Sequence, residues 1–183
     1  PSYPGLLMME ELMNLESSLN SSSRPTVAIV GGKKVSSKFP ILHNLSSRVD
    51  IIVIGGAMAN TFLKAKGFEI HKSYHEADLV KDVLEFLKNA KCKLILPTDV
   101  VCAELIGEKF IDPYVCEVSG VRQSTSILDI GPDSCENIIS ILKQSKTVVW
   151  NGPVGMFEDP RFACGTHTLA RAISKLTSQK KIK

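Results

Sequence analysis

The sequence lacks the features that mark membrane, secreted and nucleic-acid-binding proteins. It has no long apolar run and no secretory signal pattern, so we expect a cytoplasmic protein that does not bind membranes. Its five cysteines are odd in number and form no CxxC pair, and its histidines lack ligand spacing, so we predict no metal site. Aromatic residues are only 6% and the net charge only +3, which argues against nucleic-acid binding.

What the sequence does contain is a regular alternation of apolar runs and amphipathic stretches. Short apolar runs predict buried strands at residues 26–30, 50–54, 93–96 and 147–150. Helical spacing predicts helices at residues 6–19, 39–47, 57–66, 76–90, 132–144 and 163–177, with Ile41 and Leu84 among the inward-facing side chains. This pattern indicates an α/β fold: one domain over residues 1–183, with a doubly wound parallel sheet of Rossmann-like, three-layer type.

One stretch interrupts the alternation. Residues 99–130 contain short apolar runs and turn residues but no long helical pattern, so we expect a small excursion such as a β-ribbon. If the first three strands run outward and the fourth crosses back beside the first, the strand order is 3-2-1-4.

A glycine pair with basic neighbours follows the first strand. Gly31 and Gly32 are followed by Lys33, Lys34 and Lys38, with two serines between the lysines. Glycines, lysines and a following helix N-terminus suit phosphate binding. The spacing is that of neither a Walker A loop nor GxGxxG, so an ordinary strand-to-helix turn with a solvated basic helix start is an equal alternative.

The predicted strand order brings a second segment to the same place. Ligands of open parallel sheets bind beyond the carboxyl ends of the strands, where the strand order reverses. That point lies between Val30 and Trp150, so GGKKVSSK faces WNGPVGMFE. Asn151 and the lysines suit phosphates, and Glu158 suits ribose hydroxyls. The alternative is a structural turn at Asn151 and a solvated acid at Glu158.

The motifs together resemble a known family. GGKKVSSK, IGGAMANTFLKAKG, LPTDVV, LDIGP and VVWNGPVGMFE occur in the order and spacing of the C-terminal, nucleotide-binding half of phosphoglycerate kinase. WNGPxGxFE is close to unique to that family. GLLMMEEL is similar to the segment with which the family leaves its interdomain helix, so residues 1–20 are expected to be the end of that segment and the first helix.

The resemblance implies an ADP/ATP site. Lys34 and Lys38 match the family's two lysines near the nucleotide phosphates, so they are the expected catalytic residues. The residues expected to bind the nucleotide are Gly31, Gly32, Lys33, Lys34, Lys38, Gly55, Gly56, Leu128, Asn151, Pro153, Val154 and Glu158. The sequence departs from the family at Lys33, where the family has Ala, and at Ser37, where it has Asp.

The implied reaction is phosphoryl transfer between 1,3-bisphosphoglycerate and ADP, with Mg²⁺, in glycolysis. The resemblance also implies that three family features lie outside this sequence: the N-terminal domain that binds phosphoglycerate, the Gly-Gly-Gly-Asp-(Ser/Thr) loop that helps hold Mg²⁺, and the last strands of the sheet. We therefore expect an inactive fragment of a monomeric kinase. Its open edge at residues 147–150 should either self-associate or be closed by the chain's own tail at residues 179–183.

Two other functions fit the fold. The chain could instead be an isolated adenine-nucleotide-binding module without catalysis. A dinucleotide-dependent oxidoreductase is disfavoured, because GxGxxG is missing after the first strand and no ribose-binding acid follows about 20 residues later.

Overall fold

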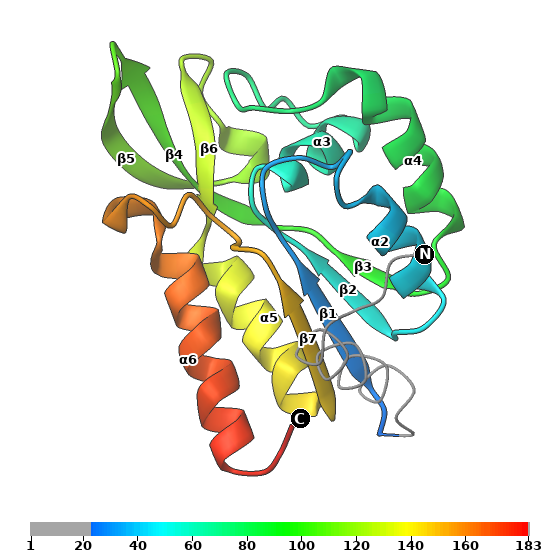
Figure 1. The fold of residues 1–183 in the computed structure, drawn as a ribbon. Helices are drawn as coiled ribbons and strands as arrows, with labels where there is room; N and C mark the ends of the chain where they lie inside the picture. Colours follow the sequence, from blue (N-terminus) through cyan, green and yellow to red (C-terminus); the bar gives the residue numbers. More distant parts are fainter. Residues whose placement is uncertain (1–22, 183) are drawn as a thin grey trace, which may run out of the picture.

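A four-stranded parallel sheet forms the centre of the molecule (Figure 1). This computed structural model describes residues 23–182, so the helix expected at residues 6–19 and the segment 1–20 lie outside the described residues. The sheet has the order β3-β2-β1-β7, which confirms the predicted order. All three strand pairs are parallel. The strands are β1 (Thr26–Val30), β2 (Ile51–Ile54), β3 (Lys93–Ile95) and β7 (Thr147–Asn151).

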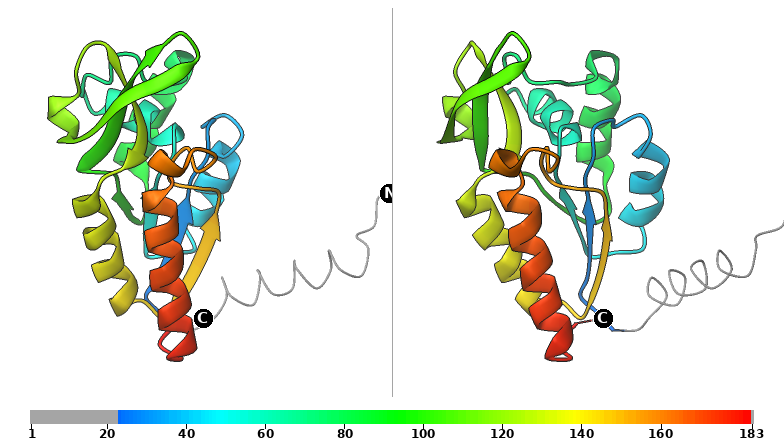
Figure 2. Two further views of the ribbon diagram at one scale, coloured as in Figure 1. Left: turned by 90° about the vertical axis from the view of Figure 1, so that its left-hand side faces the viewer. Right: turned by 60° about the vertical axis from the view of Figure 1, so that its left-hand side comes forward.

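Helices cover both faces of this sheet, as Figure 2 shows from two sides. One face carries α2 (Phe39–Ser46), α3 (Met58–Ala65) and α4 (Val80–Asn89). The other carries α5 (Pro132–Gln144) and α6 (Cys164–Ser178). Alternate residues of β1 enter the two cores, because successive strand side chains point to opposite faces. The three-layer α/β prediction is therefore confirmed.

The stretch predicted as a β-ribbon is a separate three-stranded antiparallel sheet. It contains β4 (Asp99–Ile106), β5 (Lys109–Glu117) and β6 (Thr125–Ile130) in the order β5-β4-β6. Short 3₁₀ turns lie at Val118–Gly120 and Pro160–Phe162. Figure 1 shows this sheet beyond the carboxyl ends of the parallel strands, where a ligand of such a fold would bind.

Asp99 joins the small sheet to helix α5. Its Oδ1 accepts hydrogen bonds from Ser134 N at 2.7 Å and Ser134 Oγ at 2.6 Å, and its Oδ2 accepts from Asp133 N at 3.0 Å. A carboxylate at a helix N-terminus satisfies free N–H groups and is favoured by the helix dipole. Gly131 permits this contact, since a Cβ there would lie 2.1 Å from Asp99 Oδ2.

Helix faces differ from the predicted ones at two positions. Ile41 and Leu84 are exposed, while Phe86, which the periodicity did not single out, is buried. The Phe86 ring packs against Phe39 and Phe62, with centroids 5.7 Å and 6.3 Å away, so this larger side chain takes the inward position and turns Leu84 outward. The helix predicted over 76–90 begins with a 3₁₀ turn at Ala77–Leu79.

β7 is the last strand of the parallel sheet in the part of the chain that the structure describes. Beyond α6, the side chain of Ile182 is buried in the core cluster that Val148 and Trp150 contact. The self-association expected at the β7 edge stays a prediction. Within residues 23–182, every helix is too short or too polar to cross a membrane.

Candidate functional site

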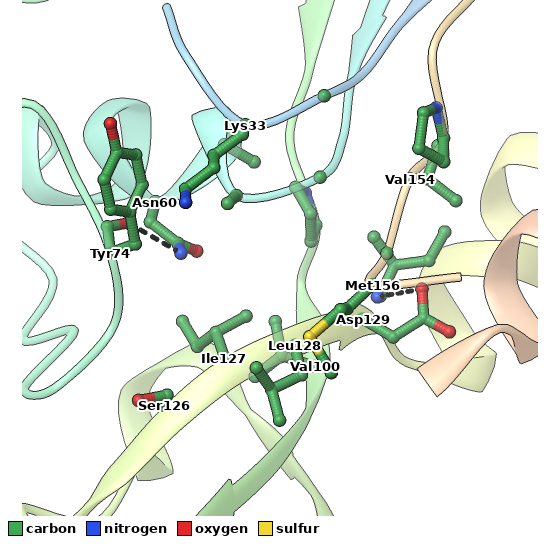
Figure 3. A pocket seen from close by; sticks show the side chains of 18 of the residues that line it. Lys33, Asn60, Tyr74, Val100, Ser126, Ile127, Leu128, Asp129, Val154 and Met156 are labelled. Atoms are coloured by element: carbon green, nitrogen blue, oxygen red, sulfur yellow. Dashed lines mark hydrogen bonds between the residues drawn. The ribbon is translucent and has the colours of Figure 1, made fainter. Parts of the chain in front are cut away.

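A pocket of about 570 Å³ opens where β1, β2 and β7 end and the small sheet begins. Its walls are mainly apolar, with a few polar groups, as is usual for small-molecule sites. Figure 3 shows Tyr74 and Asn60 on one side and Val154 and Met156 across from them. Seven residues of the predicted site line the pocket: Gly32, Lys33, Gly56, Leu128, Pro153, Val154 and Glu158.

Two glycines of the predicted site, Gly31 and Gly55, lie outside the pocket lining and allow the strand ends to pack closely. Gly31 N donates to Asn151 O at 2.8 Å, and a Cβ on Gly31 would lie 2.0 Å from the carbonyl oxygen of Pro153. A Cβ on Gly55 would lie 2.7 Å from the Val154 side chain. Only glycine allows these backbones to approach so closely. The contact confirms that the first strand end faces the WNGPVGMFE segment.

Lys38 and Asn151 lie outside the pocket lining but next to Gly32, which belongs to it, since a Cβ on Gly32 would lie 3.9 Å from Lys38 Cε. Lys38 Nζ donates a hydrogen bond to Asn151 Oδ1 at 2.5 Å. Lys38 is also the N-cap residue of α2. The helix α2 begins at Phe39, as predicted, and turns separate it from Gly32. The Lys38 ammonium supplies a full positive charge beside Asn151.

Lys34, also expected at the phosphates, is exposed and lies outside the pocket lining. Its loop is held by Glu76, whose carboxylate accepts from Ser36 N at 3.0 Å and Ser36 Oγ at 2.6 Å. Partial burial acts to raise the pKa of Glu76, but the hydrogen bonds from Ser36 and the charge of Lys34 bring it below its ordinary value. The charge of Lys34 therefore acts on a carboxylate of its own chain.

Lys33, the residue that departs from the family pattern, lies in the pocket wall. Its Nζ is 5.0 Å from the centre of the Tyr74 ring, a cation–π distance. The side chain reaches into the space beside Asn60 (Figure 3). The pocket edge is therefore both narrowed and positively charged at this position.

Sequence reasoning missed Asp129, a buried carboxyl in the pocket lining. Asp129 is 2% exposed and accepts hydrogen bonds from Ile130 N at 2.9 Å and from Gly165 N, in the first turn of α6, at 2.8 Å. Burial raises its pKa to about 6, and the two backbone hydrogen bonds oppose that rise. A Cβ on Gly155 would lie 2.1 Å from Asp129 Oδ1, so the carboxyl is closely enclosed. Its place between apolar neighbours in LDIGP was the available signal.

Asn60 was missed as well. It lines the pocket from α3 and is completely buried. An asparagine inside an apolar helical face is unusual, since its side chain competes with the backbone for hydrogen bonds, and this was the available signal. Among residues 23–182, no group of three or more His, Cys, Asp or Glu side chains is placed to hold a metal ion.

The parallel sheet, its two helical layers and the pocket at its carboxyl edge define a doubly wound α/β protein with a small-molecule-type site. The family model described as phosphoglycerate kinase matches residues 1–183. The chain therefore belongs to the phosphoglycerate kinase family.

Individual relatives agree with this family. The chain is 45% identical over 174 residues to a phosphoglycerate kinase of Francisella philomiragia, covering 93% of the chain and 44% of the relative. It is 40% identical over 185 residues to one of Caulobacter vibrioides, covering all of the chain and 46% of the relative. The chain thus spans less than half the length of these curated relatives.

Solved structures show the same fold. The phosphoglycerate kinase structure from Coxiella burnetii superposes with a TM-score of 0.87 at 38% identity, over 93% of this chain and 45% of that one. The one from Pyrococcus horikoshii gives a TM-score of 0.78 at 27% identity, over 92% of this chain and 44% of that one.

Proposed function

We propose that this chain is the C-terminal, nucleotide-binding half of a phosphoglycerate kinase and that its pocket binds ADP or ATP. The observation that carries the proposal is the pocket of about 570 Å³ over the ends of β1, β2 and β7, with the Lys38–Asn151 pair at its edge. Apolar walls suit a base, the ammonium suits phosphates, and the Glu158 carboxylate suits ribose hydroxyls.

Lys38 is the residue proposed to neutralise phosphate charge. Asn151 Oδ1 occupies one of the three N–H donors of its ammonium and so fixes its position. The other donors are available to a phosphate. Phosphoryl transfer needs little covalent help from the protein, so positioned positive charge is the main contribution that this residue makes. Lys34 is proposed to add positive charge from its exposed loop.

In the whole protein, the phosphoryl group would pass from the acyl phosphate of 1,3-bisphosphoglycerate to the β-phosphate of ADP, giving 3-phosphoglycerate and ATP in cytoplasmic glycolysis. Family members use Mg²⁺ with the nucleotide, but the described residues offer no cluster of acids that fits the metal. From the family resemblance, we propose that the metal-binding aspartate and the phosphoglycerate site belong to other parts of the whole protein. The chain alone should bind nucleotide and catalyse nothing.

The test is calorimetric titration of the chain with ADP. Glu158→Ala should weaken ADP about tenfold by removing a partner of the ribose hydroxyls, and it should not affect 2′,3′-dideoxy-ADP. Glu136→Ala, which removes an exposed acid on α5, is the matched control and should change neither ligand. Absence of ADP binding at millimolar concentration would refute the proposal.

A coupled assay for ATP formation tests the catalytic part. Turnover by the purified chain would contradict the expectation that it is inactive alone. The alternative is a nucleotide-binding module that never takes part in catalysis. It predicts the same titrations but no activity when the chain is joined to the rest of a phosphoglycerate kinase.

A further inference from the structure

Asn60 is a fully buried amide in the pocket wall with one unsatisfied polar atom. It is the third residue of α3 and has 0% exposure. Its Nδ2 donates a hydrogen bond to the carbonyl oxygen of Tyr74 at 3.0 Å. Its Oδ1 has no hydrogen-bond partner and essentially no accessible surface. Buried carbonyl oxygens in folded proteins are rarely left in this state.

The orientation of this amide is determined by its partner. The Tyr74 carbonyl can only accept, so Nδ2 has to face it and Oδ1 has to face away. Figure 3 shows the Asn60 side chain directed into the pocket beside Lys33. Thr61, the next residue of α3, holds the same loop, because its Oγ1 accepts from Glu76 N at 3.1 Å. The acceptor therefore stays aimed at the pocket.

An acceptor in this position selects ligands by their donors. The rest of the pocket lining is mainly apolar and includes Leu63, Ile127 and Val154, so few competing polar groups are available. A ligand that presents an N–H satisfies Oδ1, while a ligand that presents a carbonyl oxygen sets two acceptors against each other. Sites built around a buried polar group discriminate strongly against analogues that leave the group unpaired.

We propose that Asn60 Oδ1 selects the base of the bound nucleotide by accepting a hydrogen bond from the exocyclic amino group of adenine. This inference rests on the proposed function, which places a nucleotide in the pocket. Glu158 lines the pocket and comes after Val154 and Met156 in the sequence. Val154 and Met156 lie across the pocket from Asn60 (Figure 3). Ribose hydroxyls are donors for Glu158, so the base amine is the donor left for Asn60.

Lys33 is the side chain that has to move when the base enters. It is exposed and rests over the Tyr74 ring at 5.0 Å, so displacing it breaks no hydrogen bond among the described contacts. Lys33 could also produce the opposite base preference. If its ammonium stayed in the pocket, it would donate a hydrogen bond and favour a 6-oxo purine such as hypoxanthine. The two residues therefore predict opposite base preferences, and one comparison of ligands separates them.

The experiment compares the dissociation constants of ADP, purine riboside diphosphate and IDP for the unmodified chain. The first ligand carries an amine at position 6, the second carries hydrogen and the third carries a carbonyl. We expect ADP to bind about tenfold or more tightly than IDP, with purine riboside diphosphate between them. Asn60→Leu, similar in size but without the acceptor, should bring the ratio of ADP to IDP affinity close to one.

Thr61→Val is the matched control, because it loosens the same loop without changing the pocket wall. It should keep the preference for ADP, and a loss of preference there would show that Asn60 acts only by anchoring the loop. Equal binding of ADP and IDP, or tighter binding of IDP, to the unmodified chain would overturn the assignment while the proposed function stands. Absence of binding by all three ligands would overturn both.

Discussion

The buried carboxyl of Asp129 predicts an unusual dependence of stability on pH. Its pKa rises from an ordinary value of 3.8 to about 6 in the folded chain, chiefly because burial disfavours the charged form. Well below pH 3.8 the group is protonated in both the folded and the unfolded chain, so its burial then carries no cost from ionisation. As pH rises towards 6, the unfolded chain releases this proton more readily than the folded chain. Ionisation of Asp129 therefore lowers the free energy of unfolding, and the folded chain becomes less stable.

The size of the effect follows from the two pKa values. A tenfold change in proton affinity is worth about 1.4 kcal/mol, so the carboxylate of Asp129 costs about 3 kcal/mol at neutral pH. About 2 kcal/mol of that cost develops between pH 4.5 and 7.5, with the steepest change below pH 6. Asn at this position cannot ionise. Its amide nitrogen would face one of the two backbone N–H groups, which adds a cost that does not vary with pH.

The assay is urea unfolding of the unmodified chain and Asp129→Asn from pH 4.5 to 7.5. The free energy of unfolding of the unmodified chain, minus that of the variant, should fall by about 2 kcal/mol over this range. Ser126→Ala, on the same strand, is the control: it removes a hydrogen bond to the Lys72 carbonyl oxygen and should shift stability equally at every pH. A difference between chain and Asp129→Asn that stays constant with pH would refute the reasoning.

Three further predictions concern catalysis, thiol chemistry and close backbone approach. In a full-length phosphoglycerate kinase containing this chain, Lys38→Ala should lower kcat about 100-fold or more and change KM for ADP less. An unchanged kcat in steady-state assays would exclude a role for Lys38 in catalysis. At pH 7, iodoacetamide should modify the exposed Cys164 first. Cys102 should react only after unfolding, because it is fully buried and burial raises its pKa to about 12. Peptide mass mapping checks the order of modification. Gly31→Ala should destabilise the chain by about 2 kcal/mol or more in urea unfolding, because its Cβ would lie 2.0 Å from a carbonyl oxygen, while Gly120→Ala, whose Cβ would meet nothing nearer than 3.7 Å, should be nearly neutral.

Much of the site was readable as a set of motifs, but their roles in the structure are divided. Gly32 and Pro153 line the pocket, whereas Gly31 and Gly55 allow the strand ends to pack. The sequence does not distinguish a glycine that lines a pocket from one that lets two backbones pack together. It shows that a side chain is missing, but not whether a ligand or another part of the chain occupies that space. Asp129 and Asn60 escaped notice since single polar residues inside apolar runs carry no spacing signal.

The sequence by itself determined the parallel sheet, because strands buried on both faces must be apolar along their whole length. Within residues 23–182 it also determined the positions of the helices, through their periodicity, and over the whole chain it determined the family, through motifs in a fixed order. Tertiary structure alone decided which face of a helix is buried, as at Leu84 and Phe86, and that residues 99–130 form a three-stranded sheet. It alone joined Lys38 to Asn151 by a hydrogen bond, within two segments that the predicted strand order already placed opposite each other, and left Asn60 Oδ1 without a partner. The physical reason is that contacts between distant residues depend on the path of the whole chain, whereas the local pattern records only what each segment must bury.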